Sequence, residues 1–386
     1  MRRSYLHLLG VLFSLPLLFG SCGNGDNALE EIINGGGSSS VAVKSITLTK
    51  TTLILSVSEA DVHLNATVDP AGTAVTWLSN NTAAATVDET GKVHAVAAGT
   101  ATITAKAGDK SATCEVTVIP KGTLVGLFSV GASKKVRFSR SNLQATYEDS
   151  KWTWYFDVNQ WYYIGNDEGN TKISDSSPFV SGYTGSSTTV DLFGWVGASS
   201  TWTGVNKYGI TSSTTTNAAD GYGDSTTDDL NDWGTNIGTG WRTLTSAEWT
   251  YLLSTRKVTV GVEQASYGQG NVEGKNGLII LPDNWDGSVD ANFTYGNSEW
   301  SNVYSSTTTP TWAQMEAAGC AFLPAAGSRF GTSVDGVGTY GFYWSSTPDG
   351  SDANKAYYLR FNSTGLNSDF NSRYYAFSVR LVLDVE

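Results

Sequence analysis

The residues best suited to chemistry lie near the C-terminus, between Gly341 and Val382, and their types suit binding rather than catalysis. This segment is crowded with Tyr, Asn, Ser, Asp and Arg. Tyrosine offers rigid amphipathic area at low entropic cost, and Asn, Ser and Asp offer adaptable hydrogen bonds. The residues that we expect to contact a ligand are Tyr343, Trp344, Asp352, Asn354, Tyr357, Arg360, Asn362, Asn367, Asp369, Asn371, Arg373, Tyr374 and Tyr375.

Three positions of this set are the strongest candidates, because Tyr and Arg dominate binding hot spots. They are Arg360, Arg373 and one of Tyr374 or Tyr375. Residues 362–372 are too polar to bury without many partners, so we expect a surface loop there. In residues 377–382, alternation predicts that Phe377, Val379 and Leu381 share one buried face.

Side chains for nucleophilic or metal chemistry are scarce. The three histidines are His7, His63 and His94, so the chain beyond residue 94 cannot build a Ser-His-Asp triad or a His-ligated metal site. Cys114 and Cys320 are expected to be buried and unpaired, because a lone Cys without a His partner is usually a small hydrophobe. We therefore predict a protein that is not an enzyme and that uses no metal or cofactor.

Two groups of acids leave alternatives open. A glycoside hydrolase could use two carboxylates such as Glu248, Glu299 or Glu316. Glu248 has another explanation, because Thr245-Ser246-Ala247-Glu248 has the pattern of a helix capping box. One loop is rich in acids whose oxygen ligands would suit calcium: Asp220, Asp224, Asp228, Asp229 and Asp232. Their spacing fits no known calcium-binding loop, so a solvated loop is favoured.

The N-terminus predicts export and a membrane anchor. The net charge of −12 disfavours nucleic acid as a partner. Arg2 and Arg3 precede a short apolar run, 6–19, that is too short to span a membrane, so residues 1–21 are expected to be a signal peptide. Gly20-Ser21-Cys22 resembles the lipobox of bacterial lipoproteins, which implies lipidation of Cys22; a plain secretory signal is the alternative. Residues 22–42 are Gly/Ser-rich and predict a flexible tether.

The residue after the lipidated cysteine bears on location. In bacterial lipoproteins an Asp there is a common inner-membrane retention signal, whereas this chain has Gly23. The resemblance therefore implies an outer-membrane protein, lipid-anchored and exposed at the cell surface.

Residues 43–119 predict an Ig-like β-sandwich, because short strands with turn signals follow one another at even spacing. Trp77 is expected in its core. Trp77, Ser79 and Asn81, with the segments 85–93 and 97–105, resemble the bacterial Ig-like group 2 module. That resemblance implies a spacer or adhesive domain.

Residues 123–386 predict a mixed α+β domain. Helices are expected after Thr245 and over 311–318, and buried strands over 278–281 and 321–323. Segments such as 241–253, 276–287 and 341–347 resemble the Fibrobacter succinogenes major paralogous domain and its Bacteroidetes relatives. That group is related to the C-type-lectin-like fold of formylglycine-generating enzymes, whose reactive cysteine pair this chain lacks.

The second resemblance implies ligand binding. C-type-lectin-like domains of this branch include the variable proteins of diversity-generating retroelements, whose ligand surface is a mutagenised C-terminal segment. Residues 343–375 have that composition; a fixed polar hairpin is the alternative. We therefore expect a surface lipoprotein that binds a glycan or protein. The rival classes are a fimbrial or structural assembly subunit and, less favoured, a glycoside hydrolase.

Overall fold

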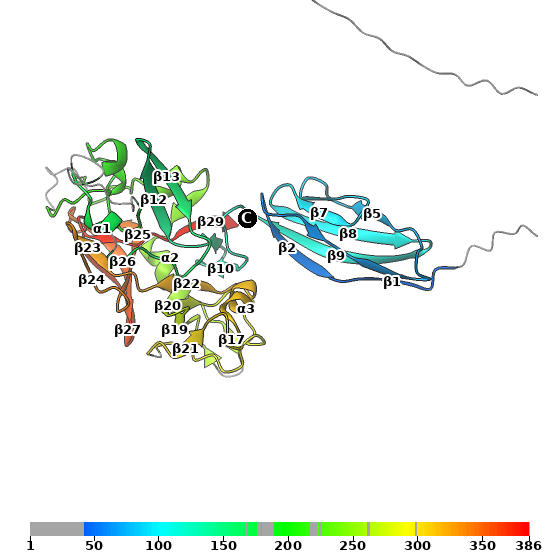
Figure 1. Cartoon of the computed structure of the whole chain (residues 1–386). Helices are drawn as coiled ribbons and strands as arrows, with labels where there is room; N and C mark the ends of the chain where they lie inside the picture. Colours follow the sequence, from blue (N-terminus) through cyan, green and yellow to red (C-terminus); the bar gives the residue numbers. More distant parts are fainter. Residues whose placement is uncertain are drawn as a thin grey trace, which may run out of the picture.

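The computed structural model shows two bodies joined end to end through residues 120–123 (Figure 1). It describes residues 42–166, 168–175, 179, 189–215, 222–223, 226–260, 263–297 and 299–385. The predicted signal peptide, Cys22 and nearly all of the tether therefore lie outside the described residues. Among those that are described, no helix is long and apolar enough to cross a membrane.

The first body, residues 42–119, is a sandwich of short strands. A four-stranded sheet in the order β2-β9-β8-β5 faces the sheet β3-β7-β6, and β1 pairs with β4. The core between them includes Ile103, Cys114 and Val116, which alternate with exposed residues along β8 and β9. The strands are β1 (Ser45–Leu48), β2 (Thr52–Ser56), β3 (Val62–His63), β4 (Ala66–Asp69), β5 (Thr76–Ser79), β6 (Ala85–Val87), β7 (Lys92–Ala95), β8 (Gly99–Ala107) and β9 (Lys110–Ile119).

Trp77 packs against the apolar clusters of this sandwich but remains half-buried rather than fully enclosed. The β6–β7 turn approaches it so closely that only glycine fits at residue 91. A Cβ there would lie 2.5 Å from the Leu64 carbonyl oxygen and 2.6 Å from the Trp77 ring, and the φ angle of Gly91 is +87°. The turn therefore closes directly over the tryptophan.

The second body, which follows the linker, is built mainly from short β-strands and the loops between them. Its four-stranded sheets are β10-β11-β29-β16, β15-β28-β23-β24 and β21-β19-β20-β22. Its smaller sheets are β13-β12-β14, β25-β26-β27 and β17-β18. The strands are β10 (Phe128–Ser129), β11 (Lys135–Phe138), β12 (Leu143–Glu148), β13 (Lys151–Phe156), β14 (Thr189–Val190), β15 (Phe193–Gly194), β16 (Trp241–Thr243), β17 (Thr259–Val260), β18 (Glu263–Gln264), β19 (Tyr267–Val272), β20 (Lys275–Ile280), β21 (Asn302–Tyr304), β22 (Ala321–Pro324), β23 (Ser328–Phe330), β24 (Ser333–Asp335), β25 (Gly341–Pro348), β26 (Lys355–Asn362), β27 (Gly365–Ser372), β28 (Ala376–Phe377) and β29 (Leu381–Val385).

The helices of the second body are short. Thr245 and Thr311 each close a capping box at the start of a helix, which confirms both predicted helices. The elements are α1 (Glu168–Thr171), α2 (Ser246–Thr250), which continues as the π-helical turn η4 (Tyr251–Thr255), α3 (Trp312–Ala317), and the 3₁₀ turns η1 (Gly204–Tyr208) and η3 (Trp233–Asn236). The second body is therefore a multi-sheet, mostly β structure with a few short helices, and the predicted α+β class is not confirmed.

The ends of the second body meet in one sheet. β11 pairs with β29, so that Phe138 lies opposite Val382. The predicted buried strands are confirmed, because β20 and β22 pair and their apolar residues are enclosed. Cys114 and Cys320 are buried and free, as predicted.

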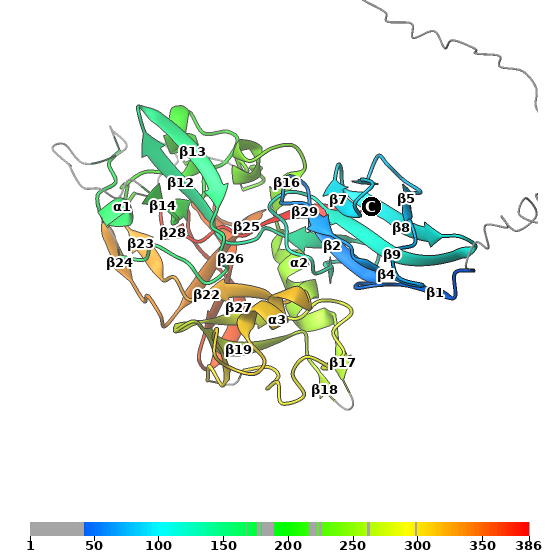
Figure 2. The same ribbon diagram turned by 45° about the vertical axis from the view of Figure 1, so that its right-hand side comes forward.

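The sheet β25-β26-β27 lies between the two larger cores of the second body. Tyr343, Leu359 and Phe361 belong to one core, and Trp344 and Tyr358 belong to the other. α2 contacts β25 and β26, and Figure 2 shows it beside them. β25 and β26 are therefore buried on both faces along part of their length, whereas β27 is the edge strand.

Candidate ligand-binding face

The hairpin of β26 and β27 positions most of the predicted ligand contacts. Residues 362–372 were expected to be a loop, but Gly365–Ser372 form a strand that pairs along its whole length with β26. The polar side chains need not be buried in this arrangement, because β27 is an edge strand whose residues are largely exposed or half-buried. The prediction of a loop was wrong, although the run does lie at the surface.

One surface of this sheet brings polar and aromatic side chains into rows. Phe342, Arg360 and Asn367 lie opposite one another across the three strands. Directly opposed residues of antiparallel strands point to the same face, so these three share it. Asp369 lies opposite Tyr358, and Asn371 lies opposite Ala356, on that same face.

Aromatic rings extend this surface on both sides. The guanidinium carbon of Arg360 lies 5.1 Å from the ring centroid of Tyr340, which stacks on Phe342 at 5.8 Å. Beyond the end of β27, Tyr374 and Tyr375 stack at 5.0 Å between ring centroids. Phe330, 40% exposed, lies 5.4 Å from each of those two rings. We call this surface the binding face; it consists of Phe330, Tyr340, Phe342, Arg360, Asn367, Asp369, Asn371, Tyr374 and Tyr375.

A buried aromatic layer supports the binding face. Phe377 stacks on Phe342 at 5.0 Å and lies 6.0 Å from Tyr375. Trp344 packs on Phe377 at 4.4 Å, and its indole N–H donates to the Phe193 carbonyl at 2.7 Å. A small hollow of about 270 Å³ opens at one end of the face, lined in part by Arg360, Asn362 and Asn367. Exposed polar groups thus stand on a rigid base.

Three predicted contacts are core residues instead. Tyr343 and Trp344 are fully buried, and the Tyr343 hydroxyl donates to the Pro324 carbonyl at 2.8 Å. Arg373 is also fully buried: its guanidinium stacks 4.2 Å from the Trp195 ring centroid and lies 3.7 Å from the Asp228 carboxylate. Burial lowers the pKa of Arg373 to about 10. These three residues cannot touch a ligand at the surface, and the prediction for them was wrong.

Three further predicted contacts lie away from the binding face. Tyr357 points to the opposite face of the sheet, where its ring meets Phe370 at 5.9 Å. Asp352 and Asn354 build the turn before β26. The Asn354 backbone N–H donates to the Asp352 carboxylate at 3.0 Å, and this bond and Lys355 hold the pKa of Asp352 below its usual value.

Three residues of the binding face were not predicted from the sequence: Phe330, Tyr340 and Phe342. The alternation of Tyr340, Phe342 and Trp344 was a usable signal, because period-two spacing places them on one face of a strand. Phe330 carried no such signal, since it reaches the face only through the pairing of β23 with β28.

Two of the acids considered for calcium, Asp228 and Asp232, have partners within the protein, and Asp229 is exposed. Asp220 and Asp224 lie outside the described residues. Asp228 accepts hydrogen bonds from the Ser199 backbone and hydroxyl at 2.9 and 2.7 Å, and Asp232 caps η3 and binds Thr243. Within the described ranges, no group of three or more His, Cys, Asp or Glu side chains is placed to hold a metal ion.

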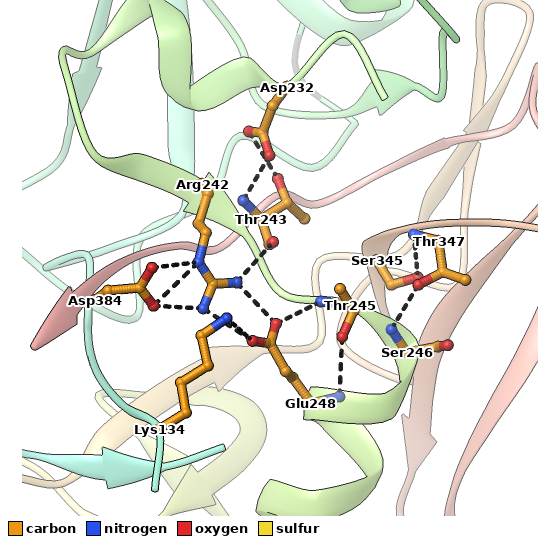
Figure 3. A network of polar contacts seen from close by, with 10 residues as sticks. All are labelled: Lys134, Asp232, Arg242, Thr243, Thr245, Ser246, Glu248, Ser345, Thr347 and Asp384. Atoms are coloured by element: carbon orange, nitrogen blue, oxygen red, sulfur yellow. Dashed lines mark hydrogen bonds and ion pairs between the residues drawn. The ribbon is translucent and has the colours of Figure 1, made fainter. Parts of the chain in front are cut away.

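Glu248 is held in a polar network at the start of α2 (Figure 3). Its carboxylate accepts from Arg242 at 2.8 and 2.9 Å, from Lys134 at 2.7 Å and from the Thr245 backbone N–H at 2.8 Å. Burial alone would raise the pKa of Glu248, but Arg242 and Lys134 outweigh it and the pKa is lowered. The other two glutamates considered for hydrolysis lie elsewhere, Glu299 in an exposed turn and Glu316 on α3.

Comparisons with known proteins cover parts of the chain. Residues 297–382, which contain β25 to β28, match a domain family of unknown function, DUF8237. A search of curated proteins finds no match. Among solved structures, the chain resembles domains 4 and 5 of the S-layer protein SbsC, with 24% identity over 20% of this chain and a TM-score of 0.18. The chain spans about half (53%) of that structure's length.

A longer SbsC structure, "Structure of surface layer protein SbsC, domains 1-6", is also similar. It shares 16% identity over 30% of this chain and 22% of its own length, with a TM-score of 0.19. The N-terminal body matches a named family: residues 42–118 fit the family "Bacterial Ig-like domain (group 2)". The first body of this chain is therefore a bacterial Ig-like domain of group 2.

Proposed function

We propose that this protein is a lipid-anchored protein of the outer-membrane surface that binds an extracellular glycan or protein through its C-terminal body. The Ig-like domain would act as a spacer. The binding face carries the proposal, because it gathers exposed and half-buried aromatic, amide, carboxylate and guanidinium groups on a buried aromatic base. Tyr and Arg at such positions are typical of binding hot spots.

The proposal includes the C-type-lectin-like relationship implied by the sequence and the idea of a variable segment. Its support is physical. Asn367, Asp369 and Asn371 alternate on one face of an edge strand, so their side chains can change without opening a cavity in either core. Such a strand tolerates many polar residues while its backbone stays paired with β26.

Binding rather than catalysis is the activity that these residues support. Glu248, one of the carboxylates considered for hydrolysis, is used as a helix cap and ion-pair partner. The end-to-end arrangement of the two bodies supports the spacer role, since the second body lies at the end of the Ig-like domain away from β1 (Figure 1).

The binding face is tested by a double variant, Arg360→Ala with Tyr375→Ala. Binding of the full chain to arrays of glycans and of extracellular proteins should be lost, whereas the thermal midpoint should stay within a few degrees. Tyr357→Ala is the matched control, because this tyrosine lies on the opposite face of the same strand. Unchanged binding by the double variant would show that recognition lies elsewhere.

The anchor is tested separately with Cys22→Ala. This variant should be released from membranes and should no longer incorporate labelled fatty acid. If it still fractionates with the outer membrane and carries the label, the lipid-anchor proposal is wrong.

A further inference from the structure

We propose that the junction between the two bodies is a second binding site, for a short neutral saccharide. A hollow of about 490 Å³ lies there, lined by residues of both bodies and of the linker between them. This volume is within the range of small-molecule sites, roughly 300–1,000 Å³. None of its lining residues belongs to the binding face, so the site is independent of the proposed function.

Aromatic rings of the second body form one wall of the hollow. Phe156 at the end of β13 and Trp241 at the start of β16 lie 4.9 Å apart between ring centroids. Trp154, two residues earlier on β13, is fixed by Phe193 at 5.7 Å and Tyr208 at 5.4 Å. All three rings are half-buried rather than enclosed. They are therefore held rigidly and still present apolar area to the hollow.

The linker passes directly against this wall. Gly122 has a φ angle of +80°, and a Cβ at this position would lie 3.2 Å from the Phe156 ring and 3.7 Å from the Trp241 ring. The close approach brings the Ig-like domain next to the aromatic residues. It is the reason that one hollow has walls from both bodies.

Charged groups also line the hollow. Glu59 of the Ig-like domain forms an ion pair with Arg140 of the second body, and both residues line the hollow. The pair has no net charge, and the remaining charge on the lining, Lys121, is on an exposed side chain that solvent screens, so the hollow favours a neutral ligand over an ionic one. An arginine has five N–H donors and a carboxylate about four acceptor positions, so each keeps capacity for further hydrogen bonds. The exposed Lys121 adds a further hydrogen-bond donor.

This combination fits a sugar better than an apolar molecule. A pyranose ring has a face of C–H groups, which packs on the negative face of an aromatic ring, and hydroxyls at its edge that donate and accept hydrogen bonds. A purely apolar ligand would remove Glu59 and Arg140 from water without replacing their hydrogen bonds, which costs free energy. The chemistry of both walls is satisfied together only by an amphipathic neutral ligand.

The site is tested with the full chain on an immobilised panel of oligosaccharides built from neutral hexoses, followed by titration calorimetry with the best of them. Trp241→Ala should weaken binding at least about tenfold, because aromatic contacts are typical hot spots. Trp152→Ala is the matched control: this tryptophan lies on β13, packs on Tyr147 and Phe179, does not line the hollow, and its loss should leave affinity unchanged.

A second variant keeps the test valid if Trp241→Ala does not fold. Lys121→Trp adds bulk at an exposed position that lines the hollow and removes no core contact. It should also weaken binding at least about tenfold with the thermal midpoint unchanged. The inference is overturned if the parent binds no member of the panel, if Lys121→Trp binds like the parent, or if Trp152→Ala loses as much affinity as Trp241→Ala.

The binding-face double variant separates this inference from the proposed function. Arg360→Ala with Tyr375→Ala should keep its affinity for the saccharide, since neither residue lines the junction. Loss of saccharide binding in that variant, with Lys121→Trp unaffected, would assign the saccharide to the binding face and overturn the second site.

Discussion

Arg373 shows that a residue type common at binding hot spots can be a core element. Its buried guanidinium stacks on Trp195 and pairs with the buried Asp228. Arg373→Ala would leave the Asp228 carboxylate buried without its cation, so we expect a loss of about 3–5 kcal/mol in the free energy of unfolding. Urea denaturation of the two proteins measures this difference.

Arg360→Ala is the matched control for that experiment. Arg360 is half-exposed, and its interaction with Tyr340 is of a kind worth about 0.5–1 kcal/mol at exposed sites. Equal stability losses in the two variants would contradict the different roles assigned to the two arginines.

Asp191 should make stability depend on pH. Burial raises the pKa of this carboxyl to about 6, despite hydrogen bonds from Asn170 and the Ile164 backbone. The folded state therefore holds the proton more tightly than the unfolded chain, whose pKa is about 3.9. The contribution of Asp191 to the free energy of unfolding is fully present below about pH 4. It is lost as the pH rises through 6, a change of about 3 kcal/mol.

The variant Asp191→Asn isolates this contribution. The stability difference between parent and variant, measured by urea unfolding at pH 4, 5, 6 and 7, should move in favour of the variant as the pH rises. Contributions from other titrating groups are common to both proteins and cancel in the difference. A difference that does not vary with pH would refute the assignment.

At the scale of elements, the start of α2 depends on one carboxylate. Glu248 both completes the capping box of Thr245 and pairs with Arg242 and Lys134 (Figure 3). Glu248→Gln keeps an acceptor for the Thr245 N–H but removes the charge. We expect a loss of about 2 kcal/mol at pH 7, in the range of hydrogen bonds to charged groups, measured by urea unfolding.

The pH dependence of that loss follows from the lowered pKa of Glu248. The carboxylate stabilises the fold above the unfolded pKa, and the contribution is lost as the pH falls through the folded value. The difference in the free energy of unfolding between the parent and Glu248→Gln should therefore become smaller at low pH. Glu299→Gln is the control, because Glu299 is exposed in a turn and its substitution should change stability little.

Local patterns predicted the elements whose cause is local. The capping boxes at Thr245 and Thr311 depend on residues three apart, and both helices begin where expected. The apolar run that became β20 was likewise readable. The long polar run of β27 was not, because its strand conformation comes from pairing with β26 rather than from its own composition.

The candidate site was predictable only in part, for the same reason. Composition found Arg360, Asn367, Asp369, Asn371, Tyr374 and Tyr375, which the fold gathers on one face. It could not tell that Arg373 and Arg380 are buried, since their partners are distant in sequence: Asp228 for the first, and Gln160, at 2.9 Å, for the second. Long-range pairing decides which polar residues of such a segment are exposed.

At the scale of the whole molecule, the Glu59–Arg140 ion pair connects the two bodies. Both side chains are partly exposed, so Glu59→Ala should lower the free energy of unfolding by less than about 1 kcal/mol. It should, however, broaden the distribution of distances between spin labels placed on β8 and β26. Lys110→Ala, at an exposed ion pair within the Ig-like domain, should leave that distribution unchanged.

The pairing of β11 with β29 has a consequence for the timing of folding. The strand of Phe138 cannot pair with its partner until Val382, roughly 240 residues later in the sequence, has been synthesised. During synthesis this sheet therefore cannot close until β29 has left the ribosome.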